Sequence, residues 1–378
     1  MAENNLRLHM PGHSGGKGFK VEELRAVAAM DLSEVPGLDD LHLPLQAIKS
    51  ARLLLADAFG AGQSLFLLNG ATSGIHALFL SLLPEGTKVI VPRNAHRSFY
   101  GGMVLSGALP VYLPGCLAPG LGVVLANRSE DISHLLKQNP EVKGVFLCSP
   151  SYYGTSSELE KISLLLRENN KLLLVDEAHG GHFPFHPAYP RPALQCGADA
   201  VVNGLHKTLP VLNQGACLHL SAEFTEWEQV LAAWSLLTTT SPSYPILASI
   251  DLARQLMVEK GFSLLERAAC LSQNYKSRIN QIKGIHCFEE EELKALPGVS
   301  GVDPLKLLIS TQELTIDGLA VAKVLRQKYR IQVELAAPGI ILAMMSIFHE
   351  GDDWERLYRA LEELARDYRA RAPVTLAE

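Results

Sequence analysis

The chain has 378 residues, of which 47% are hydrophobic and 20% charged, and 34 Lys and Arg residues stand against 40 Asp and Glu residues. This is the composition of a globular protein with room for two domains, and without a basic stripe it argues against nucleic acid as the main partner. No apolar run reaches the ~18–20 residues of a membrane span, and the first thirty residues lack the apolar core of a signal peptide. The six cysteines form no CxxC pair, which argues against a disulfide framework or a zinc ribbon and favours a cytoplasmic location.

Short, nearly all-apolar runs alternate with helix-length amphipathic segments along the first 245 residues. Such runs indicate strands buried on both faces, as in a mainly parallel sheet covered by helices. The predicted strands are 64–68, 88–91, 109–113, 144–148, 171–175, 199–202 and 216–220, and helices are predicted between them, for example at 73–83 and 158–169.

The pattern changes after Pro242. The remaining sequence predicts one or two long helices over 245–282, then strands and helices in mixed order. The later segments are 305–310, a helix at 318–329, 332–335, 340–347 and a closing helix at 352–371. This α+β block predicts a second, smaller domain.

Polar clusters follow five of the predicted strands. They are 69–74, 93–96, 149–152, 176–179 and 203–207. In open α/β sheets, ligands bind beyond the carboxyl ends of the strands. The clusters therefore predict a single site at that edge of the sheet.

The first cluster, 69–74, is a glycine-containing loop between a strand and a helix. Backbone amides at the helix N-terminus, with the hydroxyls of Thr72 and Ser73, could bind a phosphate, although either hydroxyl could simply cap the helix. Other glycine motifs do not fit: 12–18 is one residue short of a P-loop, no GxGxxG follows a strand, and GATSG is not GxSxG. This argues against nucleoside triphosphates, NAD and serine-hydrolase chemistry.

Asp176 ends the predicted strand 171–175. Its carboxylate could bind a metal, hold a ribose, pair with a protonated ring nitrogen, or cap the following segment. His179 and His182 are separated by two glycines, and no third ligand is visible near them. The sequence therefore predicts no metal site.

Lys207 follows the apolar strand 199–202. A lysine at such a place is costly to bury unless it has a partner or is used chemically, and a lysine in a desolvated pocket can form a Schiff base with a carbonyl. A phosphate-binding loop, a carboxylate for a ring nitrogen, a flat side chain to stack on a ring and this lysine together are what a protein needs to hold pyridoxal 5'-phosphate (PLP).

The sequence resembles the ornithine/lysine/arginine decarboxylases, a family of fold-type-I PLP enzymes. The matching segments run in family order over nearly the whole chain: HMPGHSGG (9–16), PGLDDLH (36–42), NGATSG (69–74), RNAHRS (93–98), DEAHGGHF (176–183), HKTLP (206–210), TTSPSYP (239–245) and DPLKLLI (303–309). The resemblance implies an aspartate-aminotransferase-like α/β fold, with a seven-stranded, mainly parallel sheet and a homodimer with shared active sites. The implied division is an N-terminal arm contributing to the active site (1–45), a large PLP-binding domain (46–245) and a small C-terminal domain (246–378).

The resemblance also implies roles for residues at matching positions. Lys207 would form the Schiff base with PLP, Asp176 would pair with the pyridine nitrogen, and His179 would lie near the reactive edge of the cofactor. His96 and Ala178 would lie against the two faces of the ring. The phosphate would be held by Thr72, Ser73 and His206, and by Ser241 and Ser243 of the neighbouring subunit. Candidate substrate contacts are His13, Ser14, Asp39, Asp40 and Tyr152, although Asp39 and Asp40 could equally form a solvated turn.

The activity implied is decarboxylation of arginine, lysine or ornithine through an external aldimine and a quinonoid. Aminotransferases of this fold hold the substrate carboxylate with a small-domain arginine, and no arginine follows segment 340–347 in residues 348–351. The chain departs from the family at His13–Gly16 and at Gly204-Leu205, and it is expected to be a short form without the C-terminal accessory domain. These departures leave open a cyclodehydration of a hydroxylated arginine to a cyclic guanidino amino acid, or a catalytically inactive regulatory homologue.

Overall fold

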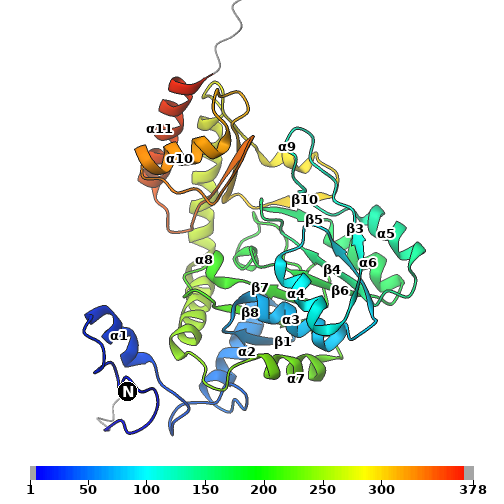
Figure 1. The fold of residues 1–378 in the computed structure, drawn as a ribbon, viewed down its shortest axis with the longest axis vertical. Helices are drawn as coiled ribbons and strands as arrows, with labels where there is room; N and C mark the ends of the chain where they lie inside the picture. Colours follow the sequence, from blue (N-terminus) through cyan, green and yellow to red (C-terminus); the bar gives the residue numbers. More distant parts are fainter. Residues whose placement is uncertain (1–5, 370–378) are drawn as a thin grey trace, which may run out of the picture.

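The computed structural model describes residues 6–369, which form a large sheet and a small sheet connected by one long helix (Figure 1). The large sheet has the strand order β1-β8-β7-β6-β4-β2-β3, and β8 runs antiparallel to both of its neighbours. Its strands are β1 (Gln63–Leu67), β2 (Lys88–Pro92), β3 (Leu109–Leu113), β4 (Gly144–Cys148), β6 (Leu172–Asp176), β7 (Ala200–Asn203) and β8 (Ala216–Leu220). All seven predicted strands are confirmed, as is the mainly parallel α/β sheet.

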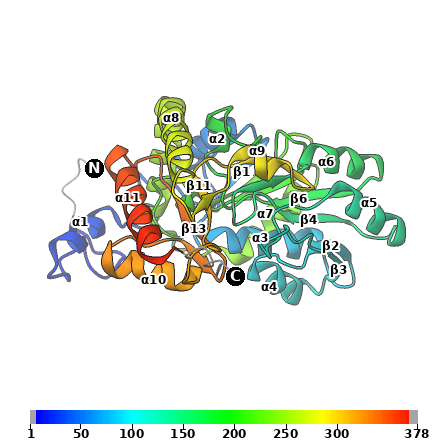
Figure 2. The same cartoon turned by 90° about the horizontal axis from the view of Figure 1, so that it is seen from above.

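Both faces of the large sheet are buried. Along β4, Phe146 packs into one core, whereas Val145 and Leu147 pack into another on the opposite face. This alternation follows from the two-residue period of a strand, and it explains why the strands are apolar throughout. Figure 2 shows α3 (Gly70–Leu82) and α4 (Arg97–Ser106) on one side and α6 (Leu159–Glu168) on the other. Further helices are α2 (Ala47–Phe59), α5 (Ser129–Gln138) and α7 (Trp227–Leu237).

The small sheet is antiparallel, with the order β12-β13-β11-β9. Its strands are β9 (His286–Cys287), β11 (Lys306–Ser310), β12 (Leu335–Ala337) and β13 (Ile340–Met344), and α10 (Gly318–Lys328) and α11 (Gly351–Tyr368) pack on one face. The predicted strand 332–335 is displaced toward the C-terminus, because pairing with β13 begins only at Leu335. The predicted strand 340–347 ends early at Met344. The predicted end of the closing helix, at 371, lies outside the described residues.

The long helix α8 (Tyr244–Ile279) connects the two parts. Leu247 and Ile250 belong to the core of the large sheet, whereas Tyr275 and Ile279 belong to the core of the small sheet. The two parts also meet in a two-stranded ribbon in which β5 (Thr155–Ser157) pairs with β10 (Val299–Val302), beside the short helix α9 (Glu290–Lys294). The small sheet is thereby held over the carboxyl ends of the large-sheet strands.

The N-terminal segment lies apart from the small sheet. Its helix α1 (Glu22–Met30) contacts α8 and is at the lower left of Figure 1. Residues 38–45 continue beneath the large sheet, where His42 Nδ1 lies 3.1 Å from Ser235 Oγ at the end of α7. Within residues 6–369, none of the helices combines the length and the apolar character that crossing a membrane requires.

Candidate active site

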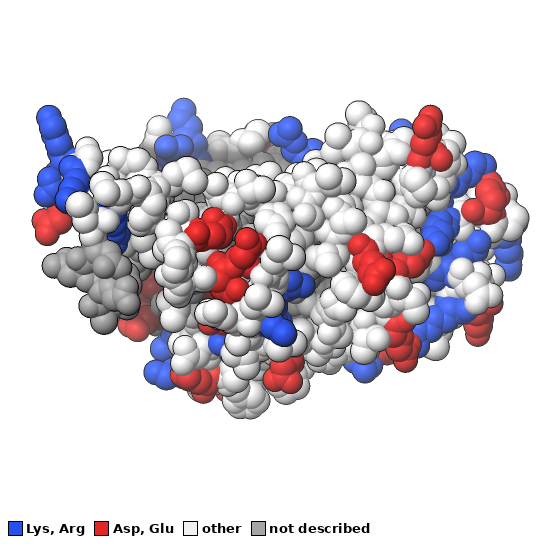
Figure 3. All heavy atoms as spheres, turned by 90° about the horizontal axis from the view of Figure 1, so that it is seen from below, with Lys and Arg blue, Asp and Glu red and all other residues white. Residues whose placement is uncertain are grey.

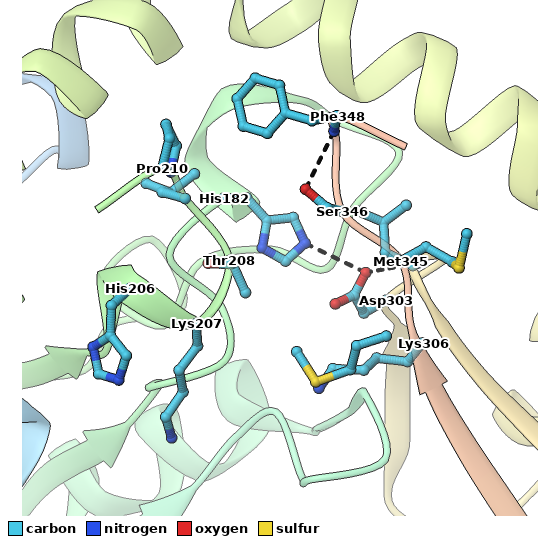
Figure 4. Close-up of a pocket in the computed structure, with 13 residues that line it drawn as sticks. His182, His206, Lys207, Thr208, Pro210, Asp303, Lys306, Met345, Ser346 and Phe348 are labelled. Atoms are coloured by element: carbon cyan, nitrogen blue, oxygen red, sulfur yellow. Dashed lines mark hydrogen bonds and ion pairs between the residues drawn. The ribbon is translucent and has the colours of Figure 1, made fainter. Parts of the chain in front are cut away.

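A cavity of about 880 Å³ lies where β1, β4, β6 and β7 end. It is lined by members of all five predicted polar clusters and by residues from the small sheet: Asn69, Gly70, Ala71, Thr72, Ile75, Asn94, His96, Cys148, Pro150, Tyr152, Asp176, Ala178, His179, His206, Lys207, Asn213, Gln214, Glu334 and Met344. An adjoining cavity of about 250 Å³ shares His206, Lys207 and Met344 with it (Figure 4). The predicted convergence of strand-end clusters is therefore present.

Lys207 is half-buried in the single-turn helix η2 (Leu205–Lys207), directly after β7. Its Nζ lies 3.2 Å from His179 Nε2. The Ala178 backbone and the Lys207 side chain both lie close to Gly204. A Cβ added at Gly204 would lie 3.0 Å from the Ala178 carbonyl oxygen and 3.3 Å from Lys207 Cδ. A glycine at this position therefore leaves room for the Lys207 side chain to run along the Ala178 backbone into the cavity.

Asp176 is the last residue of β6 and is buried. Its Oδ1 accepts a hydrogen bond from Ala178 N at 3.1 Å, and the Cys148 thiol lies 3.8 Å from its Oδ2. Burial raises the pKa of Asp176, while Lys207 acts in the opposite direction. A buried carboxylate that faces a cavity is stabilised as an anion by a cationic partner in that cavity.

The N-terminus of α3 opens into the same cavity. Its N-cap, Asn69, makes no capping hydrogen bond with its side chain, and Gly70, Ala71 and Thr72 line the wall. Backbone amides and the helix dipole make such a terminus a site for an anion. Ser73 is a different case: its Oγ donates to Gly70 O at 2.9 Å and it does not line the cavity, so its contact with a phosphate stays a prediction.

His96 and His206 lie on the wall near this terminus. His96 is the N-cap of α4, and its Nδ1 lies 2.8 Å from Ser98 Oγ, which fixes the ring. Burial lowers the pKa of His96, with Asp176 opposing. His206 Nδ1 lies 3.0 Å from Gly215 O. A neutral, fixed imidazole such as His96 is suited to stacking on a flat ring.

His179 is buried between two lysines. Besides Lys207 Nζ at Nε2, Lys306 Nζ of β11 lies 3.0 Å from its Nδ1. The ring of Tyr152 packs edge-on against it, with the centroids 5.0 Å apart. Burial and the two lysines lower the pKa of His179 well below its usual range. Lys306 was not among the predicted site residues, although it has the same signal as Lys207: a lysine at an otherwise apolar strand.

Glu334 is a second residue that the sequence reasoning missed. It lines the cavity from the small sheet, next to β12, and accepts a hydrogen bond from the Tyr152 hydroxyl. Burial and Glu334 raise the pKa of Tyr152 above its usual value, so the phenol stays protonated. In the sequence, Glu334 is an ordinary charged residue before a short strand, and only the fold brings it to Tyr152.

The predicted substrate contacts of the N-terminal segment do not line the cavity of their own chain. His13 Nε2 lies 3.2 Å from Asp31 Oδ2. The buried Asp39 carboxylate accepts backbone hydrogen bonds at 2.8 Å from Leu45, Gln46 and Ile48 at the start of α2.

Asp40 Oδ1 accepts from His42 N at 2.7 Å and from Leu43 N at 2.9 Å. Asp39 and Asp40 therefore stabilise a turn and a helix start. Backbone amides bind both carboxylate oxygens of Asp39 and Oδ1 of Asp40, and the role of these residues as partners of a substrate cation stays a prediction. Ser14, in a turn with φ +48°, is likewise remote from the cavity.

Ser241 and Ser243 lie between α7 and α8. Neither lines the cavity of its own chain. This placement is compatible with their predicted contribution to a neighbouring subunit and does not test it. Within residues 6–369, no three His, Cys, Asp or Glu side chains come together as metal ligands.

The residues around the cavity fit PLP. Lys207 supplies an amine, the uncapped α3 terminus an anion site, and His96 a flat ring. The buried Asp176 carboxylate faces the cavity with a raised pKa, as expected for a group whose cationic partner is the bound cofactor. Lys207, Asp176, His96 and the N-terminus of α3 all line the same cavity.

Comparisons with known proteins identify the family of the chain. The family described as "Orn/Lys/Arg decarboxylase, major domain" matches residues 1–353. The arginine decarboxylase of Bacillus subtilis is 35% identical over 96% of this chain and 74% of its own, and that of Bacillus cereus is 34% identical over 98% and 81%. The structure of the Francisella novicida lysine decarboxylase superposes with a TM-score of 0.82 at 21% identity, covering 97% of this chain.

The chain spans only 58% of the Francisella protein. The fold is thus that of the fold-type-I PLP enzymes, as the structural similarity and the seven-stranded sheet indicate. The chain belongs to the ornithine/lysine/arginine decarboxylase family, whose cofactor is PLP.

Proposed function

We propose that this chain is a PLP-dependent lyase that decarboxylates a basic amino acid, with arginine as the first candidate substrate. The observation that carries the proposal is the cavity in which Lys207 and Asp176 from the large sheet face Glu334 from the small sheet. The similarity to two arginine decarboxylases supports arginine over lysine and ornithine.

Different residues of the cavity would hold different parts of the cofactor. When bound, PLP supplies an aldehyde that condenses with amines and a ring that accepts electrons released at the substrate Cα. The α3 terminus with Thr72, and His206 beside it, would hold the phosphate, and Asp176 would keep a proton on the ring nitrogen. His96 and Ala178 would confine the ring from its two faces.

The substrate end of the cavity carries a negative charge. Glu334 accepts a hydrogen bond from Tyr152, and both line the wall contributed by the small sheet and the β4–β5 loop. A carboxylate there can bind a guanidinium or ammonium group through charge-assisted hydrogen bonds. Within the part of the chain that the structure describes, the two cavities are lined by no arginine that would hold the substrate carboxylate, which supports decarboxylation over transamination.

The proposed active unit is a homodimer. Leucines exposed by 64% to 85% lie in the N-terminal segment, α2 and α7: Leu43, Leu45, Leu53 and Leu236. This side of the molecule is shown in Figure 3, where broad uncharged areas separate clusters of charged groups. A second copy on this side would cover apolar surface and bring Ser241, Ser243 and the N-terminal segment, with His13 and Ser14, toward the neighbouring cavity.

The division into a segment of residues 1–45, a large domain of 46–245 and a small domain of 246–378 is part of this proposal. The two separate cores that α8 connects support it. All six cysteines are unpaired, which fits the reducing cytoplasm as the proposed location.

Product analysis tests the function. The purified chain with added PLP is incubated with arginine, lysine and ornithine, and we expect CO2 and the corresponding amine, fastest from arginine. Lys207→Ala should release none, with an unchanged far-UV circular dichroism spectrum. Solvent deuterium at Cα in a product that keeps its carboxylate would contradict decarboxylation.

A further inference from the structure

His179 lies in line between two lysine amines, an arrangement that the proposed function does not use. Its Nε2 is 3.2 Å from Lys207 Nζ and its Nδ1 is 3.0 Å from Lys306 Nζ. A neutral imidazole has one N–H donor and one acceptor nitrogen. One of the two amines therefore donates to the ring, and the other must accept from it through a lone pair.

The surroundings of Lys306 favour its ammonium form. Only 3% of Lys306 is exposed. Burial lowers its pKa to about 8, and Asp303 and Glu334 act in the opposite direction. The Tyr152 ring centroid lies 5.5 Å from its Nζ, a cation–π contact. At neutral pH Lys306 is thus mostly protonated, while His179 is neutral.

Other charged and titratable groups lie around Lys207, His179 and Lys306. His182 Nε2 lies 3.3 Å from Asp303 Oδ1, and Figure 4 shows Asp303 next to Lys306. His96 and Asp176 lie close enough to Lys207 for their charges to interact. Lys306 has carboxylates nearby, and His179 has none among its own nearest partners.

We propose that Lys306 is a positioning residue that fixes the tautomer of His179, with its ammonium donating to Nδ1 so that Nε2–H points at the Lys207 amine. An N–H group of His179 that donates to Lys207 Nζ stabilises the neutral amine of Lys207. The neutral amine has the free lone pair that attacks a carbonyl. This inference rests on the proposed role of Lys207 as the residue that binds PLP.

The packing around Lys306 fixes its side chain. A Cβ at Gly154, which has φ +91°, would lie 2.5 Å from Lys306 Cγ and 2.7 Å from its Cβ. The same loop is tied to the small sheet by the hydrogen bond from Asp303 N to Gly154 O, at 2.7 Å. The β4–β5 loop therefore packs closely against the first carbons of the Lys306 side chain, whose amine lies beside His179.

The tautomer is read directly by nitrogen NMR. The chain is labelled with ¹⁵N-histidine before PLP is added, and the His179 signals are identified by their loss in His179→Gln. We expect an Nε2–H ring in the wild type, an increased Nδ1–H population in Lys306→Met, and the wild-type tautomer in Lys306→Arg. Lys276→Met, which removes another buried lysine, is the matched control and should leave the His179 signals unchanged.

The second readout is the rate at which added PLP develops its visible absorption on binding, measured across pH. Loss of the neighbouring charge in Lys306→Met should raise the pH midpoint of this rate by about one unit, which is about a tenfold slower reaction at neutral pH. Lys306→Arg should restore the midpoint, and Lys276→Met should not move it.

Two results would overturn the inference: an unchanged tautomer, or an unchanged midpoint, in a folded Lys306→Met protein. Lys306→Gln repeats the test if the methionine variant does not fold. Failure of the proposed function is distinguishable, because Lys207→Ala would then develop the same visible absorption as the wild type, whatever the behaviour of the Lys306 variants.

Discussion

Single residues at the ends of apolar strands identify most of the cavity. Lys207 and Asp176 could be predicted because a charged side chain next to a buried strand needs a partner or a chemical use. Glu334 could not, because its environment is made by Tyr152, 182 residues away in the sequence. Asp39 is a carboxylate whose chemistry suits a substrate cation, but in the structure backbone amides of its own chain bind both of its oxygens.

Asp176→Asn tests the carboxylate at the end of β6. The amide keeps the size of the side chain but cannot hold a proton on a ring nitrogen, so we expect kcat to fall about 100-fold or more while the fold is kept. Steady-state kinetics and circular dichroism check this. A variant with wild-type kcat would show that Asp176 has no such role.

Glu334→Gln tests the recognition of the distal cation. Loss of a charge-assisted hydrogen bond of about 2 kcal/mol should raise KM for arginine about 30-fold, with a smaller change in kcat. Glu313→Gln, at an exposed turn outside the cavities, is the matched control and should leave both constants unchanged. The assignment fails if Glu334→Gln changes kcat but not KM.

Among the strands, the longer ones of the large sheet could be predicted from the sequence, whereas the short strands of the β5–β10 ribbon could not. Seven apolar runs of four or five residues predict the large sheet almost to the residue, because six of the strands are buried along nearly their whole length and only the edge strand β3 is largely exposed. The ribbon of β5 and β10 has no such signal, since β5 is Thr155–Ser157 and its partner follows more than a hundred residues later. Short strands of this kind are defined by tertiary pairing and not by local pattern.

The start of α2 gives a prediction on stability and pH. Burial raises the pKa of Asp39, but backbone hydrogen bonds from Leu45 and neighbouring amides outweigh it, so the pKa lies below its usual value. A carboxyl group with a lowered pKa in the folded state stabilises the protein above its unfolded pKa of about 3.9, and this contribution is lost as the pH falls through the lower folded pKa.

We therefore expect Asp39→Asn to lower the free energy of unfolding by about 2 kcal/mol at pH 7, and the difference from wild type to shrink as the pH falls below about 4. Urea unfolding at several pH values measures both effects. Asp57→Asn, at an exposed position of the same helix, is the control. A difference that is independent of pH would contradict the charged cap.

At the scale of the whole molecule, the positions of the family motifs and of the cavity of one chain coincide only in part. The segments 9–16 and 239–245 carry family motifs, yet in the structure neither lines the cavity of its own chain. Leucines exposed by 64% to 85% lie in the N-terminal segment, α2 and α7. Sequence similarity identifies such segments as functional, but only an assembly determines which cavity they serve.

Subunit complementation tests this directly. Lys207→Ala removes the essential amine, and Ser243→Asp places a carboxylate where the neighbouring phosphate is expected. In a hybrid dimer of the two variants, one cavity combines native Lys207 with native Ser243 from the other chain if Ser243 acts across the interface. Because random mixing makes half of the dimers hybrid, with one native cavity each, we expect about a quarter of wild-type activity after co-refolding. Either variant alone should be inactive. If Ser243 instead acts on its own chain, no cavity in the hybrid is native, and the mixture stays inactive.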